Sequence, residues 1–202
     1  MSDPRTPVAP EHVYRLLNHG PTVLVTSAHA GRRNVMAASW NMALDFTPPK
    51  VAVVIDKSTR TRELVEASGR FGLAVPSRAI APLVLAIGRM SARELPDGMD
   101  KFTHLSIETL PGAQDALPHP VGCLAWLDCR VLSEPAIEAR YDLFLGEVEA
   151  AWADPRVFSN GRWRYGPDTP AELQTLHYVA GGTFLTVGAP IEVEAANLVR
   201  SS

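Results

Sequence analysis

The sequence predicts a mainly β protein, built as one antiparallel barrel with a few helical insertions. Short apolar runs of strand length recur along the chain, such as Val51-Ala52-Val53-Val54-Ile55. Turn-forming residues leave short connections between several of these runs, which favours antiparallel pairing. Helical segments do not alternate regularly with strands, as they would in a doubly wound α/β sheet.

The N-terminal part begins with ten residues that hold three prolines. Residues 1–10 are expected to form a flexible or draped arm, and residues 11–202 a single domain. A short helix is predicted over Glu11–His19, where Gly20-Pro21 ends it. Strands are then predicted over residues 22–28, 34–44 and 50–55, separated by a polar turn at 29–33 and by Pro48-Pro49.

A change to helical spacing follows these strands. Leu64, Val65 and Ser68 form a stripe on a helix predicted over residues 59–67, and Gly69 is its C-terminal stop. The remaining predicted elements are a strand at 71–75, a buried helix at 80–90, a loop at 95–102, strands at 121–132 and 141–152, a loop at 154–170 rich in Trp, Arg and Tyr, and an interrupted strand at 174–187.

Composition excludes several classes of function. Hydrophobic residues make up 46% and charged residues 20% of the chain, with a net charge of -3 and a pI of about 6.1. The basic residues are scattered, so the chain lacks the cationic footprint of a nucleic-acid binder. No apolar run reaches the length of about 18 residues expected of a membrane span, and the N-terminus lacks the apolar core of a signal peptide. The expected compartment is the cytoplasm.

The two cysteines support the same compartment. Cys123 and Cys129 lie six residues apart in one predicted strand, which would place them about 20 Å apart on one face. A disulfide needs Cα atoms within about 7 Å. Both thiols are therefore expected to be reduced.

Several familiar catalytic motifs are absent from the sequence. The chain has no Gly-x-Gly-x-x-Gly after a strand, no Walker-type phosphate loop and no Gly-x-Ser-x-Gly. Its six histidines show no metal-ligand spacing with each other or with the cysteines. Neither a metal site nor a nucleophilic thiol is predicted.

The first candidate binding segment is Ser58-Thr59-Arg60-Thr61, which joins an apolar strand to a helix. Helix N-termini present unpaired N–H groups and a partial positive charge. Hydroxyls and arginines around such an end suit a phosphate. Ordinary helix capping by Ser58 or Thr59, with solvated arginines, explains the same pattern and is the more frequent case.

The second candidate segment is rich in small residues. A strand of this kind lets a flat ligand lie against the backbone, while Asn34 and Ser39 could bond its polar edges. The alternative is a strand that another element approaches closely, with Trp40 in the core. The candidate residues are Asn34, Met36, Ala37, Ala38, Ser39 and Trp40.

The third candidate segment is His177-Tyr178-Val179-Ala180-Gly181-Gly182-Thr183-Phe184. Paired glycines permit positive φ or close approach of a ligand. A hairpin turn or a bulge explains them equally. Gly182 and Phe184 are the candidate binding residues here.

Taken together, these segments resemble the flavin reductase-like, FMN-binding split-barrel family. The similarity runs in order over roughly residues 11–187 and includes Pro48–Val53, Gly98-Met99-Asp100-Lys101-Phe102 and Phe144-Leu145-Gly146-Glu147-Val148. The resemblance implies a six-stranded Greek-key split barrel that forms a homodimer and binds FMN near the dimer interface. It implies that Ser58–Thr61 hold the phosphate, that Asn34 and Met36–Trp40 line the ring, and that the C-terminal segment closes over it.

The implied activity is NAD(P)H-dependent flavin reduction, with hydride passing from the nicotinamide to flavin N5. A flavin, another small molecule, or a redox protein such as a monooxygenase would then accept the electrons. In many members a histidine precedes the Gly-Glu-Val motif, and Tyr141 stands at that place here as a candidate nicotinamide neighbour. The alternatives are an FMN-binding electron carrier without a nicotinamide site, a non-enzymatic barrel, and a pyridoxamine-phosphate-oxidase-like enzyme.

Overall fold

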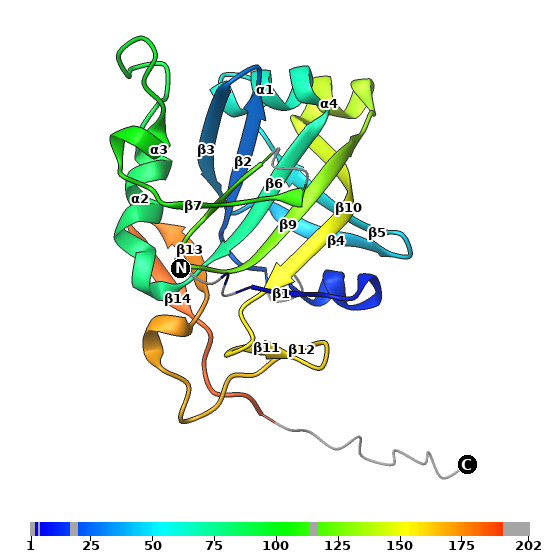
Figure 1. The fold of residues 1–202 in the computed structure, drawn as a ribbon, viewed down its shortest axis with the longest axis vertical. Coiled ribbons are helices and arrows are strands. Elements are labelled where there is room, and N and C mark those ends of the chain that lie inside the picture. The colour runs from blue at the N-terminus through cyan, green and yellow to red at the C-terminus, as the bar shows by residue number, and fades with distance from the viewer. Residues whose placement is uncertain (1–2, 4, 17–19, 114–116, 192–202) are drawn as a thin grey trace, which may run out of the picture.

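The computed structural model describes residues 3, 5–16, 20–113 and 117–191, and one antiparallel sheet dominates this part of the chain (Figure 1). Its hydrogen-bonded order is β3-β2-β6-β9-β10-β5-β4, with β1 paired to β10. Its eight strands are β1 (Thr6–Pro7), β2 (Val23–His29), β3 (Arg32–Ala38), β4 (Asn41–Phe46), β5 (Pro49–Val54), β6 (Arg70–Pro76), β9 (Cys123–Leu132) and β10 (Leu143–Ala153). The prediction of a mainly β, antiparallel fold is confirmed.

The sheet curls because its two edge strands are neighbours in the chain. Only Ser39 and Trp40 separate β3 from β4, and three Cα steps span at most about 11 Å. The two edges therefore meet at this corner, although no ladder joins β3 to β4 among the described strands. The sheet is open and has eight strands, rather than the six predicted. The single strand predicted over 34–44 is two strands, β3 and β4, which form the opposite edges of the sheet.

Helices cover the ends and one side of the sheet (Figure 1). They are η1 (Pro10–Leu16), α1 (Arg60–Ser68), η2 (Arg78–Ile80), α2 (Ala81–Arg89), α3 (Lys101–His104), α4 (Pro135–Tyr141) and η4 (Ala171–Leu173). Three small hairpins complete the described part: β7 (Thr109–Pro111) with β8 (Pro118–Pro120), β11 (Phe158–Ser159) with β12 (Arg162–Trp163), and β13 (Leu176–Ala180) with β14 (Thr183–Thr186). None of the described helices is long and apolar enough to cross a membrane.

The helix predictions hold best where capping signals are strong. Thr59 caps α1, accepting the N–H of Arg62 at 3.2 Å, and Gly69 ends it at φ 67°. The strand predicted from residue 141 begins only at Leu143, because Pro135 opens α4 and Asp142 closes it at φ 56°. The first predicted helix is the 3-10 helix η1, and residues 17–19 lie outside the described part.

The sheet is covered on both faces, which gives two main core clusters. Val23 and Val25 of β2 point into the curled interior, whereas Leu24 points outward to the cluster that includes Val84 and Ile87 of α2. These two residues are the only fully buried ones of α2. The prediction of a helix buried on most sides was therefore wrong, because most of α2 faces solvent or the cavities described below.

The two cysteines are free and buried, as predicted. Their placement on one face was wrong, because Cys129 belongs to the interior cluster and Cys123 to the outer one. A register shift near the start of β9, where Val75 pairs with Ala125 and Pro76 with Cys123, reverses the alternation.

The described part of the N-terminal arm is tied to the sheet rather than free. Thr6 and Pro7 pair with Ala153 and Trp152 of β10. The Arg5 side chain, 4% exposed, contacts His119 and donates to the carbonyl of Pro111 at 2.8 Å. His119 in turn contacts the buried carboxylate of Asp128 at 2.6 Å. Residues 1–2 and 4 are outside the described part.

Candidate functional site

Two adjoining cavities lie between β3, the start of α1, α2 and the β13–β14 hairpin. We call them the aromatic cavity, of about 200 Å³, and the cationic cavity, of about 270 Å³. Ala37, Gly88 and Arg89 line both. Most of the predicted site residues line one or the other: Asn34, Met36, Ala37, Ala38, Ser39, Ser58, Thr59, Arg60, Thr61 and Phe184.

Small residues let α2 approach β3 at the point where the cavities meet. A Cβ placed on Gly88 would lie 3.4 Å from the Cβ of Ala37, which is a tight contact. Both interpretations of the small-residue strand therefore apply to Ala37: another element packs closely on it, and it lines open space on either side. Larger side chains at these two positions would divide or fill the joint cavity.

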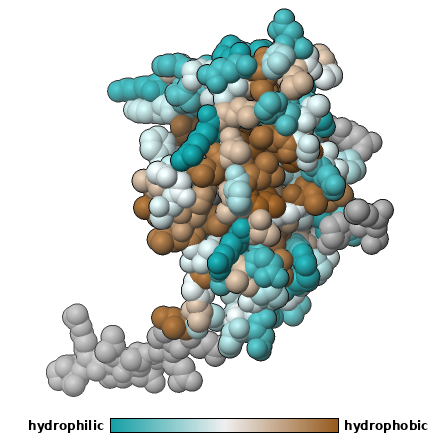
Figure 2. All heavy atoms as spheres, turned by 90° about the vertical axis from the view of Figure 1, so that its left-hand side faces the viewer, coloured by the Kyte–Doolittle hydropathy of each residue, from teal (hydrophilic) through white to brown (hydrophobic). Residues whose placement is uncertain are grey.

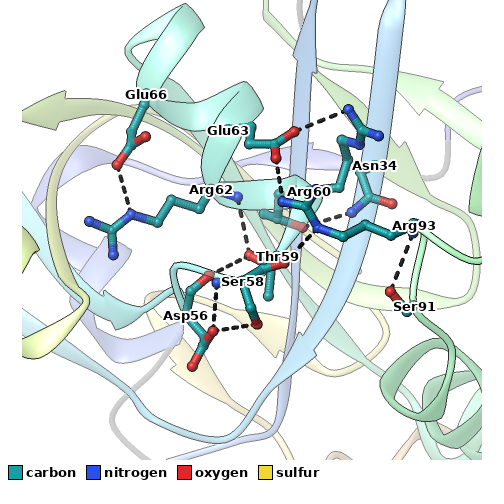
Figure 3. Close-up of polar contacts among 11 residues, drawn as sticks. Asn34, Asp56, Ser58, Thr59, Arg60, Arg62, Glu63, Glu66, Ser91 and Arg93 are labelled. Carbon is teal, nitrogen blue, oxygen red and sulfur yellow. Dashed lines mark hydrogen bonds and ion pairs between the residues drawn. The ribbon is translucent and has the colours of Figure 1, made fainter.

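The N-terminus of α1 lines the cationic cavity, and Figure 3 shows the polar contacts around this turn. Arg60 and Thr61 are the first two residues of this helix, so their N–H groups have no intrahelical acceptor. Such N–H groups, at the positive end of the helix dipole, favour an anion. The sequence prediction of an anion-binding turn is consistent with this geometry.

Much of the hydroxyl set at this turn is engaged within the protein. The Asp56 carboxylate accepts from the Ser58 N–H at 2.7 Å and from its hydroxyl at 2.6 Å, which lowers the pKa of Asp56. The Thr59 hydroxyl donates to the Asp56 carbonyl at 2.8 Å and caps α1. The capping alternative thus holds for Thr59, and cations and backbone N–H groups remain for a ligand.

Arginines flank the turn and are held in place by Glu63 (Figure 3). Arg60 Nη1 lies 3.0 Å from a Glu63 oxygen, and the other oxygen of Glu63 contacts Arg93. Arg93 also donates from Nε to the Ser58 carbonyl at 2.8 Å. Arg89, which lines both cavities, has no ion-pair partner among the described residues. This side of the cavity therefore carries excess positive charge.

Lys101 adds a buried cation to the same cavity. The residue is 4% exposed, and its ammonium makes one hydrogen bond, to the Ile87 carbonyl at 2.9 Å. No carboxylate of the described part lies within ion-pair distance of it, and burial lowers its pKa to about 8. An ammonium has three donors, so two remain for a ligand. An uncompensated buried cation of this kind is stabilised by a bound anion.

Asn34 supplies a buried acceptor to the cavity. Its Nδ2 donates to the hydroxyl of Thr61 at 3.0 Å, which links β3 to α1. Its Oδ1 is buried and has no hydrogen-bond partner. Because buried polar atoms are nearly always paired, this oxygen suits a ligand that donates a hydrogen bond.

The aromatic cavity is closed by the β13–β14 hairpin. Tyr178 and Phe184 line it, with ring centroids 5.4 Å apart in an edge-to-face contact. Gly181 and Gly182 form the hairpin turn at φ 60° and 96°, so the turn alternative is correct for them. Gly182 does not line the cavity itself, but a Cβ placed on it would lie 3.3 Å from both Arg89 and Leu85, which do.

Two predicted site residues lie apart from the cavities within this chain. Trp40 is 73% exposed and is therefore not a core aromatic either. Tyr141 ends α4, is 59% exposed and lies under the guanidinium of Arg140. Neither lines a cavity described above. The predicted loop at 154–170, rich in Trp, Arg and Tyr, also lies away from both cavities. Val157 and Phe158 are buried in the core of the chain, and Trp163 stacks on Tyr165.

Other kinds of site have little support in the described residues. They contain no group of three or more His, Cys, Asp or Glu that could hold a metal. Burial raises the pKa of both Cys123 and Cys129, which disfavours a reactive thiolate. The geometry instead suits a ligand with an anionic end beside α1 and a flat, partly apolar end between β3, α2 and the aromatic hairpin.

Sequence reasoning missed several lining residues. Arg89 stands in a helix predicted to be buried, and nothing in its pattern marks it. Lys101 stands in a segment that only the family resemblance singled out, and Tyr178 stands in the third candidate segment, where Gly182 and Phe184 were predicted instead. The unassigned lining residues that matter most are Thr22, Val84, Leu85, Gly88, Arg89, Lys101 and Tyr178.

Comparison with known proteins gives a consistent set of relatives. A family model described as "Flavin reductase like domain" matches residues 15–184. The uncharacterized protein YddH of Escherichia coli strain K12 is 45% identical over 185 residues, covering 90% of this chain and 94% of that protein.

Solved structures share the fold. An FMN-binding domain of a flavin reductases-like enzyme from Shewanella baltica OS155 has a TM-score of 0.88 at 44% identity, covering 94% of this chain and 97% of that one. Flavoredoxin of Desulfovibrio vulgaris (Miyazaki F) has a TM-score of 0.71 at 21% identity, covering 89% and 92%. The second likeness concerns the fold alone.

Proposed function

The chain belongs to the flavin reductase-like domain family, and from this premise we propose that it is an FMN-binding oxidoreductase that works as an NAD(P)H-dependent flavin reductase. The observation that carries the proposal is the pair of adjoining cavities. One holds a helix N-terminus and an uncompensated buried ammonium, and the other is bounded by two aromatic rings. The 44%-identical structure from Shewanella baltica is described as FMN-binding, which supports the same cofactor.

The chemistry of the lining residues fits FMN. Its phosphate would lie at the N-terminus of α1, against the free N–H groups of Arg60 and Thr61 and the cations of Arg60 and Lys101. The ring would lie along β3 toward the aromatic cavity, and the Oδ1 of Asn34 in the cationic cavity can accept a hydrogen bond from the ligand. In this proposal Ser58–Thr61 bind the phosphate, Asn34 and Met36–Ser39 line the ring, and Gly182 and Phe184 close the hairpin over it.

Bound FMN would supply a ring that takes hydride at N5 from a reduced nicotinamide and passes electrons on. The protein's own part is to orient the ring, to exclude water with Tyr178 and Phe184, and to neutralise charge with Lys101 and Arg89. No side chain of the cavities is required as a general acid or base. The electron acceptor is proposed to be a flavin, another small molecule or a redox protein such as a monooxygenase, and the compartment the cytoplasm.

The test is a visible absorption spectrum of the purified protein before and after addition of FMN and gel filtration. NADH and NADPH are then added separately without oxygen. Retained flavin absorbance that bleaches with either nucleotide supports the reductase. Retained flavin absorbance that does not bleach with either nucleotide would favour an electron carrier without a nicotinamide site, and would contradict the NAD(P)H step.

If the flavin is lost on gel filtration, a kinetic assay distinguishes weak flavin binding from the absence of flavin chemistry. NAD(P)H oxidation that depends on added FMN supports a reductase that binds flavin weakly. No FMN binding and no oxidation would contradict the proposal and favour a barrel without flavin chemistry.

Arg60→Ala is expected to weaken FMN binding by about tenfold or more, because a charge-assisted phosphate contact contributes about 1.5–3 kcal/mol. The measurement is FMN titration by fluorescence quenching. Arg70→Ala is a matched control, since Arg70 is also half-buried in a single ion pair, 2.6 Å from Glu149, but lies outside both cavities. Equal FMN affinity in both variants would contradict the role of Arg60.

A homodimer is the proposed assembly, and the edge strand β4 is its proposed contact. Trp40, Met42, Leu44 and Phe46 alternate along this edge and are 73%, 55%, 46% and 62% exposed. A contiguous apolar row on an edge strand is unusual for a monomer. Further apolar surface gathers on the α2 side of the molecule (Figure 2). A dimer through β4 would cover Trp40, which belongs to none of the core clusters of the described residues.

Met42→Glu with Phe46→Glu is expected to shift the protein from dimer to monomer, because two buried like-charged pairs would form across a two-fold interface. Analytical ultracentrifugation measures the mass. Val179→Glu with Leu185→Glu on the β13–β14 hairpin is the control, since these residues are similarly exposed at 55% and 60%. A wild-type monomer, or a dimer that survives the β4 charges, would contradict this contact.

A further inference from the structure

Lysine is rare in this chain, and one of its few lysines is buried. The sequence holds three, Lys50, Lys57 and Lys101, among 19 basic residues. The amine of Lys50 lies 2.5 Å from the carboxylate of Asp45, and Lys57 is exposed. Lys101 is 4% exposed and lines the cationic cavity. Unlike an arginine, a lysine can lose its proton and then act as a nucleophile.

The surroundings of Lys101 favour its neutral amine. Its Nζ donates to the carbonyl of Ile87 at 2.9 Å, and burial lowers its pKa to about 8. Among the described residues that line the cavity there is no Asp or Glu. Asp100, its neighbour in the chain, is engaged by Arg33 at 2.7 Å. At about pH 8, about half of Lys101 is therefore neutral, against less than about 1% of a lysine at the ordinary value of 10.5.

The same cavity offers an anion site beside this amine. Arg60 and Thr61, the first residues of the nine-residue helix α1, line it and have N–H groups without an intrahelical acceptor. Arg89 adds a second guanidinium. Asn34 is an independent sign of a ligand, because it is 2% exposed and its buried Oδ1 has no hydrogen-bond partner. Guanidinium groups and free N–H donors of this kind bind phosphate.

We propose that Lys101 is an acylation site whose acyl donor is a small acyl phosphate, such as acetyl phosphate, bound in the cationic cavity. Its phosphate end would bind at the start of α1, which holds the carbonyl carbon beside the amine. The neutral Nζ attacks this carbon, a C–N bond forms, and the C–O bond to the phosphate breaks. Inorganic phosphate leaves with the bonding electrons and takes up the proton that the amine releases. The product is an uncharged amide at Lys101.

Acylation would regulate the flavin site, and this part of the inference rests on the proposed function. The amide carries no charge, so the cavity loses the buried ammonium that attracts the flavin phosphate. The acyl group also occupies part of a cavity of only about 270 Å³. Bound FMN and acylation therefore exclude each other, and the modification acts on protein that is empty of flavin.

The test is site-resolved mass spectrometry of the full-length protein, with and without FMN, after timed incubation with acetyl phosphate at about pH 8. Lys50 and Lys57 are internal controls. We expect Lys101 of the flavin-free protein to be acylated at least about tenfold faster than Lys57. Inorganic phosphate and FMN are each expected to slow the reaction at Lys101, because both compete for the anion site.

A second reagent separates binding of the phosphate from simple reactivity of the amine. N-hydroxysuccinimide acetate transfers the same acetyl group but has no phosphate end. Arg60→Ala is expected to slow acylation of Lys101 by acetyl phosphate at least about threefold, and to leave its acylation by the second reagent unchanged. Arg70→Ala, outside the cavity, is the control and is expected to change neither rate.

The outcomes distinguish this inference from the proposed function. Acylation of Lys57 by acetyl phosphate as fast as that of Lys101 would overturn the inference, and so would a rate at Lys101 that inorganic phosphate does not lower. If FMN still binds in fluorescence titration, either result leaves the proposed function standing. Protection of Lys101 by inorganic phosphate but not by FMN would keep the acylation site and contradict the placement of the flavin phosphate.

Discussion

Lys101→Met is expected to weaken FMN binding by at least about 30-fold, while the ligand-free protein stays as stable as the wild type or becomes more stable. Removing one partner of a buried charge pair costs about 2–5 kcal/mol of binding. Replacing an uncompensated buried charge by an apolar side chain of similar length is instead neutral or favourable for folding. FMN titration and urea unfolding measure the two effects.

The control for Lys101→Met is Lys57→Met. Lys57 stands beside the same turn but is exposed and lines neither cavity. Its removal is expected to change FMN affinity by less than about threefold, since exposed charges contribute little. Equal losses in the two variants would show that general charge, rather than the buried ammonium, attracts the phosphate.

The lowered pKa of Lys101 adds a pH dependence with opposite signs for binding and folding. The charged form is lost above a pKa of about 8, and the FMN phosphate, with a second pKa of about 6, no longer titrates there. FMN affinity is therefore expected to fall as the pH rises through 8 and beyond, and this fall is expected to be absent in Lys101→Met.

Folding responds in the other direction. Between a folded pKa of about 8 and the ordinary value of 10.5, the unfolded chain holds a proton that the folded protein has released. The unfolding free energy contributed by this group therefore rises with pH across that window. Urea unfolding from about pH 7.5 to about pH 9.5 gives the unfolding free energies of the wild type and of Lys101→Met, and their difference isolates the contribution of Lys101. If this difference in unfolding free energy does not change with pH, the claim that Lys101 is a buried ammonium with a lowered pKa is wrong.

Phe71→Ala is expected to lower the unfolding free energy by about 3–5 kcal/mol, because it empties a fully buried aromatic position of the interior core. The Phe71 ring packs directly against Gly146, whose missing side chain leaves room for it. A Cβ on Gly146 would lie 2.5 Å from Cζ of Phe71 and 3.0 Å from Cβ of Cys129. Gly146→Ala alone is therefore expected to cost about 1–3 kcal/mol through overpacking.

The double variant tests this packing directly. With Phe71 truncated, the methyl group that Gly146→Ala adds no longer clashes with the Phe71 ring, and only its close contact with Cβ of Cys129 remains. The combined loss of Phe71→Ala and Gly146→Ala is expected to be smaller than the sum of the single losses by at least about 1 kcal/mol. Urea unfolding of the wild type, the two single variants and the double variant gives a double-mutant cycle. Strictly additive losses of unfolding free energy would contradict a contact between the two positions.

The sequence by itself determined the elements whose signals are local. The helix α1 was predictable because Thr59 and Gly69 cap it, and β5, β6 and β9 because their apolar runs have strand length. The turn with unpaired N–H groups at the start of α1 was predictable for the same reason, since a helix start leaves these groups unpaired wherever it folds. Binding of an anion there stays a prediction. Each of the three candidate binding segments has an ordinary structural explanation when taken alone, and only their occurrence together and in order resembles the family.

Only the tertiary structure decided what depends on contacts between distant segments. A single bulge near the start of β9 reverses the face of Cys123, which strict alternation cannot foresee. The corner at Ser39 and Trp40 exists because β3 pairs with β2 and β4 with β5, at opposite edges of one sheet. Lys101, Arg89 and Asn34 share one cavity because α2, α3 and β3 pack together, although 67 residues separate Asn34 from Lys101. Burial, which gives Lys101 its lowered pKa, is a property of that packing and not of the local sequence.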